Sequence, residues 1–154
     1  MAGIFFDESL VAVIDDPIDT AQVESTMADI MFNVGAVKDT YAAAIAARER
    51  DFPTALEVGE INVAIPHCDT EHVNKDAVCV GLLKKPVAWR RMDNVEMTTD
   101  VRLVFMLALS QPHAHLQMIQ KVIGIIQDQE LARLLTKCDS AEAFELLKDR
   151  LIEA

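Results

Sequence analysis

Two long apolar segments constrain the architecture of this chain more than any other feature of its sequence. Residues 77–83 (AVCVGLL) are apolar throughout, and residues 101–109 (VRLVFMLAL) carry a single charge, at Arg102. Strands with one solvated face alternate polar and apolar residues, whereas strands covered on both faces read as nearly unbroken apolar runs. Neither segment approaches the roughly 20 apolar residues that cross a bilayer. The two segments therefore predict strands of a sheet between helix layers, with residues 101–109 near its centre.

Two helices are expected in the first third of the chain. Apolar residues recur at helical spacing over residues 21–33, with Asp19 or the next residue as the N-cap. Gly35 is well placed to end this helix, because glycine is favoured just beyond a helix C-terminus. A second, alanine-rich helix is expected over residues 39–50, with Asp39 as its N-cap.

Three further helices are expected after the second apolar segment. The first covers residues 113–127, and a short one follows near residues 129–136. The last begins at Asp139, which has the spacing of a capping box with Glu142. Four residues are expected to form the apolar stripe of the first of these helices: Leu116, Ile119, Ile123 and Ile126. The last helix is expected to bury Phe144, Leu147 and Leu151.

The first apolar segment, residues 77–83, is expected to stop at residues 84–86, Lys-Lys-Pro, because proline cannot donate to a sheet ladder. Residues 87–89 then read as a separate short strand at or near an edge of the sheet. The polar residues 90–99 read as a loop.

Other strands are expected at residues 10–14 and 61–66, both rich in apolar residues. Strands and helices interleave along the whole chain, without an internal repeat. The sequence therefore predicts a single domain, residues 1–154, of the α/β (α+β) class, with helices on both faces of one sheet.

Charge and cysteine content narrow the function classes. The formal net charge of −11 argues against DNA or RNA as a partner, because phosphate backbones are met by Lys and Arg. The same charge suits a partner protein with a basic docking face, or only keeps the protein soluble. The N-terminal segment lacks the features of a secretory signal. The three cysteines, odd in number and widely spaced, are typical of free thiols in a reducing compartment. We expect a cytoplasmic protein with no direct membrane insertion.

Four histidines are candidates for chemistry: His67, His72, His113 and His115. His67 directly follows the strand expected at residues 61–66, so its ring is expected on a turn that faces water. One interpretation is a metal site built from His67, His72 and one of the later pair, although no recognised zinc spacing is present. A second is a nucleophilic Cys68 paired with His115, although nothing near Cys68 predicts the lowered pKa that a catalytic thiol needs.

A third interpretation makes His67 itself a nucleophile that carries a phosphoryl group. Such a ring needs one nitrogen free to attack and the other held by a hydrogen bond. The helix that opens at Pro112 would supply backbone N–H groups, His115 a ring N–H, and Arg48 a charged fork. Two alternatives stay open at this point. In the first, Arg48 only extends to solvent from the last turn of its helix. In the second, His115 only packs or caps near a helix end. The other two histidines are expected to be solvated.

At these residues the sequence resembles the fructose–mannitol class of enzyme IIA domains of the bacterial sugar phosphotransferase system, and its galactitol-specific branch in particular. The resemblance covers nearly the whole chain. Its central motif is VAIPH at residues 63–67, and residues 68–73 are galactitol-like. Supporting matches in the expected order are Arg48-Glu49, Phe52-Pro53-Thr54, Lys85-Pro86-Val87, residues 101–108 and His115-Leu116.

The resemblance implies a phosphotransferase that relays a phosphoryl group on a histidine and needs no cofactor and no metal. It implies that His67 accepts this group from the histidine-containing phosphocarrier protein and passes it to a cysteine of the sugar-specific enzyme IIB. The membrane enzyme IIC is then involved only indirectly. His115 and Arg48 match the second active-site histidine and the arginine beside the phosphohistidine. The implied fold is a mixed sheet flanked by helices. Two alternatives stay open: a regulatory, nitrogen-type IIA-like protein, and a small histidine-based metalloenzyme.

Overall fold

A five-stranded β-sheet forms the middle of the computed structural model, which describes residues 3–152. Its strands lie in the order β1-β4-β5-β3-β2. Neighbours β1 and β4, and β5 and β3, are parallel, whereas β4 and β5, and β3 and β2, are antiparallel. The expected mixed sheet is therefore confirmed. The strands are β1 (Val11–Ile14), β2 (Ala55–Leu56), β3 (Asn62–Ala64), β4 (Ala77–Arg90) and β5 (Thr98–Ala108). The ends of the domain expected over residues 1–154 lie outside the described residues.

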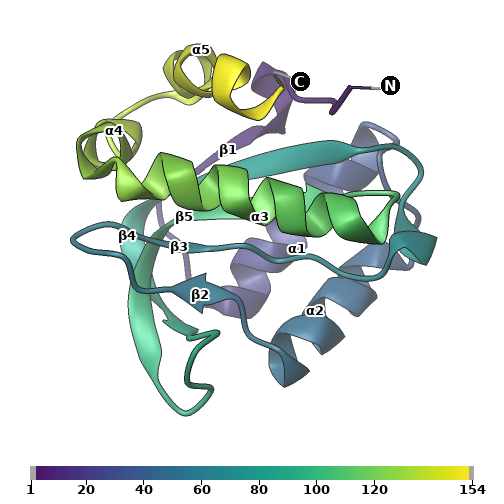
Figure 1. The fold of residues 1–154 in the computed structure, drawn as a ribbon, viewed down its shortest axis with the longest axis horizontal. Coiled ribbons are helices and arrows are strands. Elements are labelled where there is room, and N and C mark those ends of the chain that lie inside the picture. Colours follow the sequence, from purple (N-terminus) through teal and green to yellow (C-terminus); the bar gives the residue numbers. More distant parts are fainter. Residues whose placement is uncertain (1–2, 153–154) are drawn as a thin grey trace.

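Helices cover both faces of this sheet, as Figure 1 shows. One face carries α1 (Thr20–Asn33) and α2 (Tyr41–Asp51), and α3 (Pro112–Gln127) crosses the other. Both α4 (Gln129–Leu135) and α5 (Ser140–Leu151) contact α3. Two short 3-10 turns, η1 (Glu8–Leu10) and η2 (Thr70–His72), lie in the connections. The α/β class with helices on both faces is therefore confirmed.

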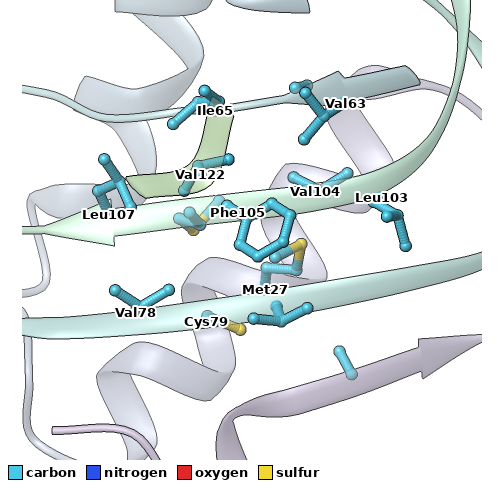
Figure 2. Packing of buried hydrophobic residues seen from close by; sticks show 14 of the residues in the cluster. Met27, Val63, Ile65, Val78, Cys79, Leu103, Val104, Phe105, Leu107 and Val122 are labelled. Atoms are coloured by element: carbon cyan, nitrogen blue, oxygen red, sulfur yellow. The ribbon is translucent and has the colours of Figure 1, made fainter. Parts of the chain in front are cut away.

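The two apolar segments identified in the sequence form the middle of the core. β5 is the central strand, and its last eight residues are buried except Arg102, which is half-buried. Figure 2 shows side chains of both helix layers meeting this part of the sheet, with Met27 from α1 and Val122 from α3. Gly81 allows α1 to approach closely, since a Cβ there would lie 2.7 Å from Met27 Sδ. The sheet is thus enclosed on both sides, which explains the unbroken apolar runs.

The expected break at residues 84–86 is wrong. β4 continues through them, and residues 87–89 belong to the same strand rather than to a separate one. The register with β5 shifts between Leu82 and Val87, so Pro86 lies where no ladder hydrogen bond is required. Because Arg90 and Thr98 still pair, the loop is shorter than the expected 90–99. The two-residue strand β2 was not predicted, because it is too short to show a pattern.

Helix termini follow the predicted caps with one exception. Asp19 caps α1 by accepting from Gln22 N at 2.9 Å, and Gly35 follows that helix with a left-handed φ of 78°. The capping box of Asp139 with Glu142 is present in α5. Asp39 is not the N-cap of α2. That helix begins at Tyr41, its N-cap residue is Thr40, and no side chain caps it.

The buried face of α3 differs from the predicted stripe. Leu116 is 61% exposed, and Ile119 and Ile123 are half-buried. Only Ile126 of the predicted set is fully buried, together with Met118, Val122 and Ile125. The helix is apolar around most of its circumference, so helical spacing alone admits two stripes. α3 is also the longest helix, yet none among the described residues is long and apolar enough to span a membrane.

Candidate active site

Side chains from three elements meet where two neighbouring strands of the sheet end. β3 and β5 run parallel, so their C-terminal ends lie at the same end of the sheet. The segment after β3 carries His67, and α3, which follows β5, carries His115 in its first turn. Arg48 comes from the last turn of α2. All three side chains line one pocket of about 410 Å³.

Backbone hydrogen bonds hold the turn that carries His67. Leu107 N donates to Pro66 O at 2.9 Å, which fastens the turn to the end of β5. Ile65 N donates to the hydroxyl of Thr54 at 3.2 Å. Pro66 itself has no N–H and a fixed φ. The Cα of His67 is therefore set by a short, well-anchored segment rather than by a free loop.

The ring of His67 is oriented by its own backbone. Its Nδ1 lies 2.8 Å from the carbonyl oxygen of Ile65. A carbonyl can only accept, so Nδ1 carries the proton and Nε2 of the neutral ring keeps its lone pair. Burial lowers the pKa of His67, and the positive charge of Arg48 lowers it further, while the bond to Ile65 opposes both. The ring is thus held neutral near pH 7 with Nε2 available.

His115 lies beside His67. The ring centroids are 5.2 Å apart and the planes are tilted by 34°. Burial lowers the pKa of His115, and repulsion from a protonated His67 lowers it further. Its Nε2 is buried and has no hydrogen-bond partner. A buried polar atom without a partner is costly and unusual, so this nitrogen is available to a group that enters the pocket.

Arg48 is partly buried at the rim of the same pocket. Its guanidinium lies over the ring of Phe52, with Cζ 5.0 Å from the centroid. One terminal nitrogen is 3.9 Å from a carboxylate oxygen of Asp69, a long and solvated ion pair. Its Nε is buried without a partner. Arg48 therefore reaches solvent and also keeps one enclosed donor, and its role in the site stays a prediction.

The remaining two histidines do not join this group. His72 Nδ1 is 2.8 Å from the hydroxyl of Thr40, and His113 is exposed. Across residues 3–152, no group of three or more His, Cys, Asp or Glu side chains could hold a metal ion. The metal site considered from the sequence therefore has no counterpart in this geometry.

The cysteines are unpaired and buried: Cys68, Cys79 and Cys138. Cys68 lines the pocket next to His67. Burial and the neighbouring Asp69 raise its pKa to about 12. A thiol with that pKa stays protonated at neutral pH and is a poor nucleophile. The pairing of a nucleophilic Cys68 with His115 is therefore not supported.

Sequence reasoning left the residues behind the histidine turn without a role. Thr54 and Glu49 are both buried, and Thr54 contacts Ile65 directly. The signal available in the sequence was a glutamate, Glu49, directly after Arg48 on an alanine-rich helix. If such a residue is buried, its carboxylate needs several hydrogen-bond donors.

The sequence matches the family described as "Phosphoenolpyruvate-dependent sugar phosphotransferase system, EIIA 2" over residues 4–150. This chain belongs to that family, and it is accordingly a transferase component of a sugar phosphotransferase system. A curated relative, the galactitol-specific EIIA component of Escherichia coli strain K12, is 27% identical over 118 residues. The match covers 77% of this chain and 78% of the relative.

Solved structures agree on the fold. The crystal structure of IIA mannitol from Escherichia coli superposes with a TM-score of 0.78 at 19% identity, covering 94% of this chain and 99% of that one. Enzyme IIAMTL in its complex with phosphorylated enzyme IIBMTL, also from Escherichia coli, gives a TM-score of 0.77 at 18% identity over 96% and 97% of the two chains. The mannitol-type IIA fold implied by the resemblance is thus confirmed.

Proposed function

We propose that His67 is the phosphoryl-accepting residue of this chain and that Nε2 is the nitrogen that becomes phosphorylated. The observation that carries the proposal is the hydrogen bond between His67 Nδ1 and the Ile65 carbonyl. It leaves Nε2 with its lone pair, in a ring that borders the pocket shared with Arg48 and His115. The proposal takes residues 1–154 as one IIA domain acting in the cytoplasm.

The transfer is an in-line displacement between two protein side chains. The lone pair of His67 Nε2 attacks the phosphorus of a phosphohistidine on the donor protein. A new N–P bond forms as the donor N–P bond breaks, and the donor nitrogen keeps the electron pair. In the second half-reaction a cysteine thiolate of the acceptor attacks the same phosphorus, and Nε2 of His67 is the leaving group. Catalysis then consists of positioning and of stabilising the equatorial oxygens.

Arg48 and His115 supply the stabilising donors. Each has a buried nitrogen without a partner, Nε of Arg48 and Nε2 of His115, and a phosphoryl oxygen would satisfy both. Before transfer, burial and the positive charges nearby lower the pKa of His115. A phosphoryl dianion in the pocket reverses the sign of the local charge and favours the imidazolium, which donates from both nitrogens. His115 then stabilises the phosphorylated state more than the free one.

The donor is the histidine-containing phosphocarrier protein and the acceptor is a sugar-specific enzyme IIB. Membership of the EIIA 2 family supports both assignments, and the fold likeness to a IIA protein solved together with phosphorylated IIB supports the acceptor. The net charge of −11 favours a donor with a basic docking face. Galactitol is the proposed sugar, because a galactitol-specific EIIA component is a relative at 27% identity.

Phosphate uptake from phosphoenolpyruvate through enzyme I and the phosphocarrier tests the proposal. Wild-type protein should acquire one acid-labile phosphate, and His67→Ala should acquire none. His113→Ala is the matched control, because His113 is an exposed histidine on the same helix as His115, and it should behave as wild type. Uptake by His67→Ala at the wild-type level would overturn the assignment. Purified galactitol-type and mannitol-type IIB proteins, offered separately to the phosphorylated chain, test the sugar assignment by the rate of transfer to each cysteine.

A further inference from the structure

A buried carboxylate lies behind the histidine turn and gathers hydrogen-bond donors. Glu49 is 7% exposed. Its Oε2 accepts from Thr54 N at 2.8 Å and from Trp89 Nε1 at 3.0 Å. Its Oε1 accepts from the Thr54 hydroxyl at 2.8 Å. Thr54 is thus held at two points by one carboxylate, and its hydroxyl proton is committed to Glu49.

The committed hydroxyl has its lone pairs free for another donor, and Ile65 N–H supplies one at 3.2 Å. Ile65 is the residue whose carbonyl receives the Nδ1 proton of His67. Because Pro66 has no N–H, the amide of Ile65 is the last backbone donor before the histidine. A residue before proline is also restricted to extended conformations, so fixing its amide fixes the direction of its carbonyl. One chain of contacts therefore runs from Glu49 through Thr54 and Ile65 to His67.

We propose that Glu49 is a positioning residue that keeps His67 in its reactive tautomer, acting through the Thr54 hydroxyl and the Ile65 backbone. This rests on the proposed role of His67 and adds the source of its orientation. Glu49 touches neither the pocket nor the reacting atoms. It acts by presenting the Ile65 carbonyl to Nδ1, so that Nε2 rather than Nδ1 is left to attack.

Only an ionised carboxylate fits this position. The hydrogen bonds to Glu49 are all donated to it, two by Thr54 and one by Trp89. Burial raises the pKa of Glu49, and these donors oppose that rise. Burial and the charge of Glu49 raise the pKa of Glu24 to about 9, so Glu24, and not Glu49, holds a proton at pH 7. A carboxylate accepts at both oxygens, whereas the amide of glutamine places an NH₂ group against a donor. Glu49→Gln therefore keeps the shape and reverses one contact.

The experiment compares three variants of the full chain. Thr54→Val removes the hydroxyl at nearly constant shape, Glu49→Gln replaces one accepting oxygen by an NH₂ donor, and Thr54→Ser keeps the hydroxyl. Two quantities are measured: the steady-state parameters for phosphorylation by the phosphocarrier, and the tautomer of His67 from the ¹⁵N shifts of labelled histidine. Thermal unfolding confirms that each variant is folded. If Thr54→Val does not fold, Glu49→Gln carries the same comparison.

We expect kcat to fall by roughly 10-fold or more in Thr54→Val and Glu49→Gln, because a misdirected nucleophile loses its near-attack geometry. KM for the phosphocarrier should not change, and the Nε2-protonated tautomer of His67 should become populated. Thr54→Ser should restore the wild-type rate and tautomer. Trp89→Phe removes a donor that does not lead to His67, so it should lower stability and leave the tautomer unchanged.

The inference is overturned if folded Thr54→Val and Glu49→Gln keep the wild-type kcat and the Nδ1-protonated tautomer. That outcome leaves the proposed function intact, provided that His67→Ala still abolishes phosphate uptake. A failure of the proposed function would instead appear as phosphate uptake in His67→Ala. The failure of the inference would be seen in Thr54→Val and Glu49→Gln, and the failure of the proposed function in His67→Ala.

Discussion

The Nδ1 atom of His67 lies 2.8 Å from the carbonyl oxygen of Ile65, two residues earlier in the chain. This single contact determines which nitrogen of the ring carries the proton, since a carbonyl cannot donate. It also explains why the histidine follows a proline. The extended conformation imposed on Ile65 by Pro66 directs the Ile65 carbonyl toward the side chain of His67.

The rate of phosphorylation should be insensitive to pH around neutrality. A protonated Nε2 has no lone pair, and burial together with the Arg48 charge lowers the pKa of His67 below its ordinary value of 6.5. Activity is therefore fully present above about pH 6.5 and is lost only as the pH falls through the lowered pKa. An NMR titration of the His67 ring measures this pKa directly.

Arg48→Ala should raise the pKa of His67, because removing a positive charge makes protonation of the ring easier. Arg50→Ala is the matched control, since Arg50 lies in the same helical turn but is solvated and faces Asp51. It should leave the titration unchanged. An unaltered His67 pKa in Arg48→Ala would remove Arg48 from the electrostatics of the site.

His115→Ala should slow phosphoryl transfer by about 100-fold, the usual effect of removing one donor to a developing negative charge. KM for the phosphocarrier should stay near the wild-type value, because the lost contact is made to the phosphoryl group. Stopped-flow or quenched-flow measurement of a single turnover gives the rate, and His113→Ala serves as the comparison. Equal rates in the two variants would contradict the role of His115.

Cys68 should be unreactive despite its position beside His67. A pKa of about 12 leaves almost no thiolate at neutral pH, and Cys79 and Cys138 are buried as well. Iodoacetamide at pH 7.5 should label none of them in the folded protein and all of them in denaturant, as seen by mass spectrometry. Cys68→Ala should retain phosphate uptake. Rapid labelling of Cys68 in the native protein would show that its thiol is not enclosed as the structure indicates.

Two aspartates that look alike in the sequence should differ in stability. Asp19 accepts from Gln22 N as the N-cap of α1, so Asp19→Ala should cost about 1 kcal/mol of unfolding free energy. Asp39 precedes α2 but makes no cap, and Asp39→Ala should cost almost nothing. Urea denaturation of the two variants side by side checks this difference. An equal loss in both would show that α2 is capped by Asp39 after all.

These two helix starts also illustrate how far the sequence leads. Asp19, Gly35 and the pair Asp139 and Glu142 act locally, within a few residues, so their patterns predict the observed caps. Continuous apolar runs predict β4 and β5, because a strand covered on both faces is apolar at nearly every position, whichever strands lie beside it. Pro86 was misleading because its tolerance depends on a register shift that only the neighbouring strand defines.

The site divides in the same way. His67 was a candidate from its place after a strand and a proline, and His115 and Arg48 from a helix start and a helix stripe. The family resemblance favoured these roles over the alternatives that the patterns left open. Their convergence on one pocket depends on β3 and β5 being parallel neighbours, which no local pattern encodes. The Glu49 and Thr54 contacts span five residues in sequence but gain their meaning only from Ile65, which reaches them through the fold.

The most direct test of this account is the identity of the phosphorylated atom. Protein labelled with ¹⁵N-histidine, phosphorylated from phosphoenolpyruvate through enzyme I and the phosphocarrier, should show ³¹P–¹⁵N coupling to Nε2 of His67 and a proton retained on Nδ1. Coupling to Nδ1 of His67, or phosphate on any other residue, would contradict the account, because the bond from Nδ1 to the Ile65 carbonyl would then not direct the chemistry.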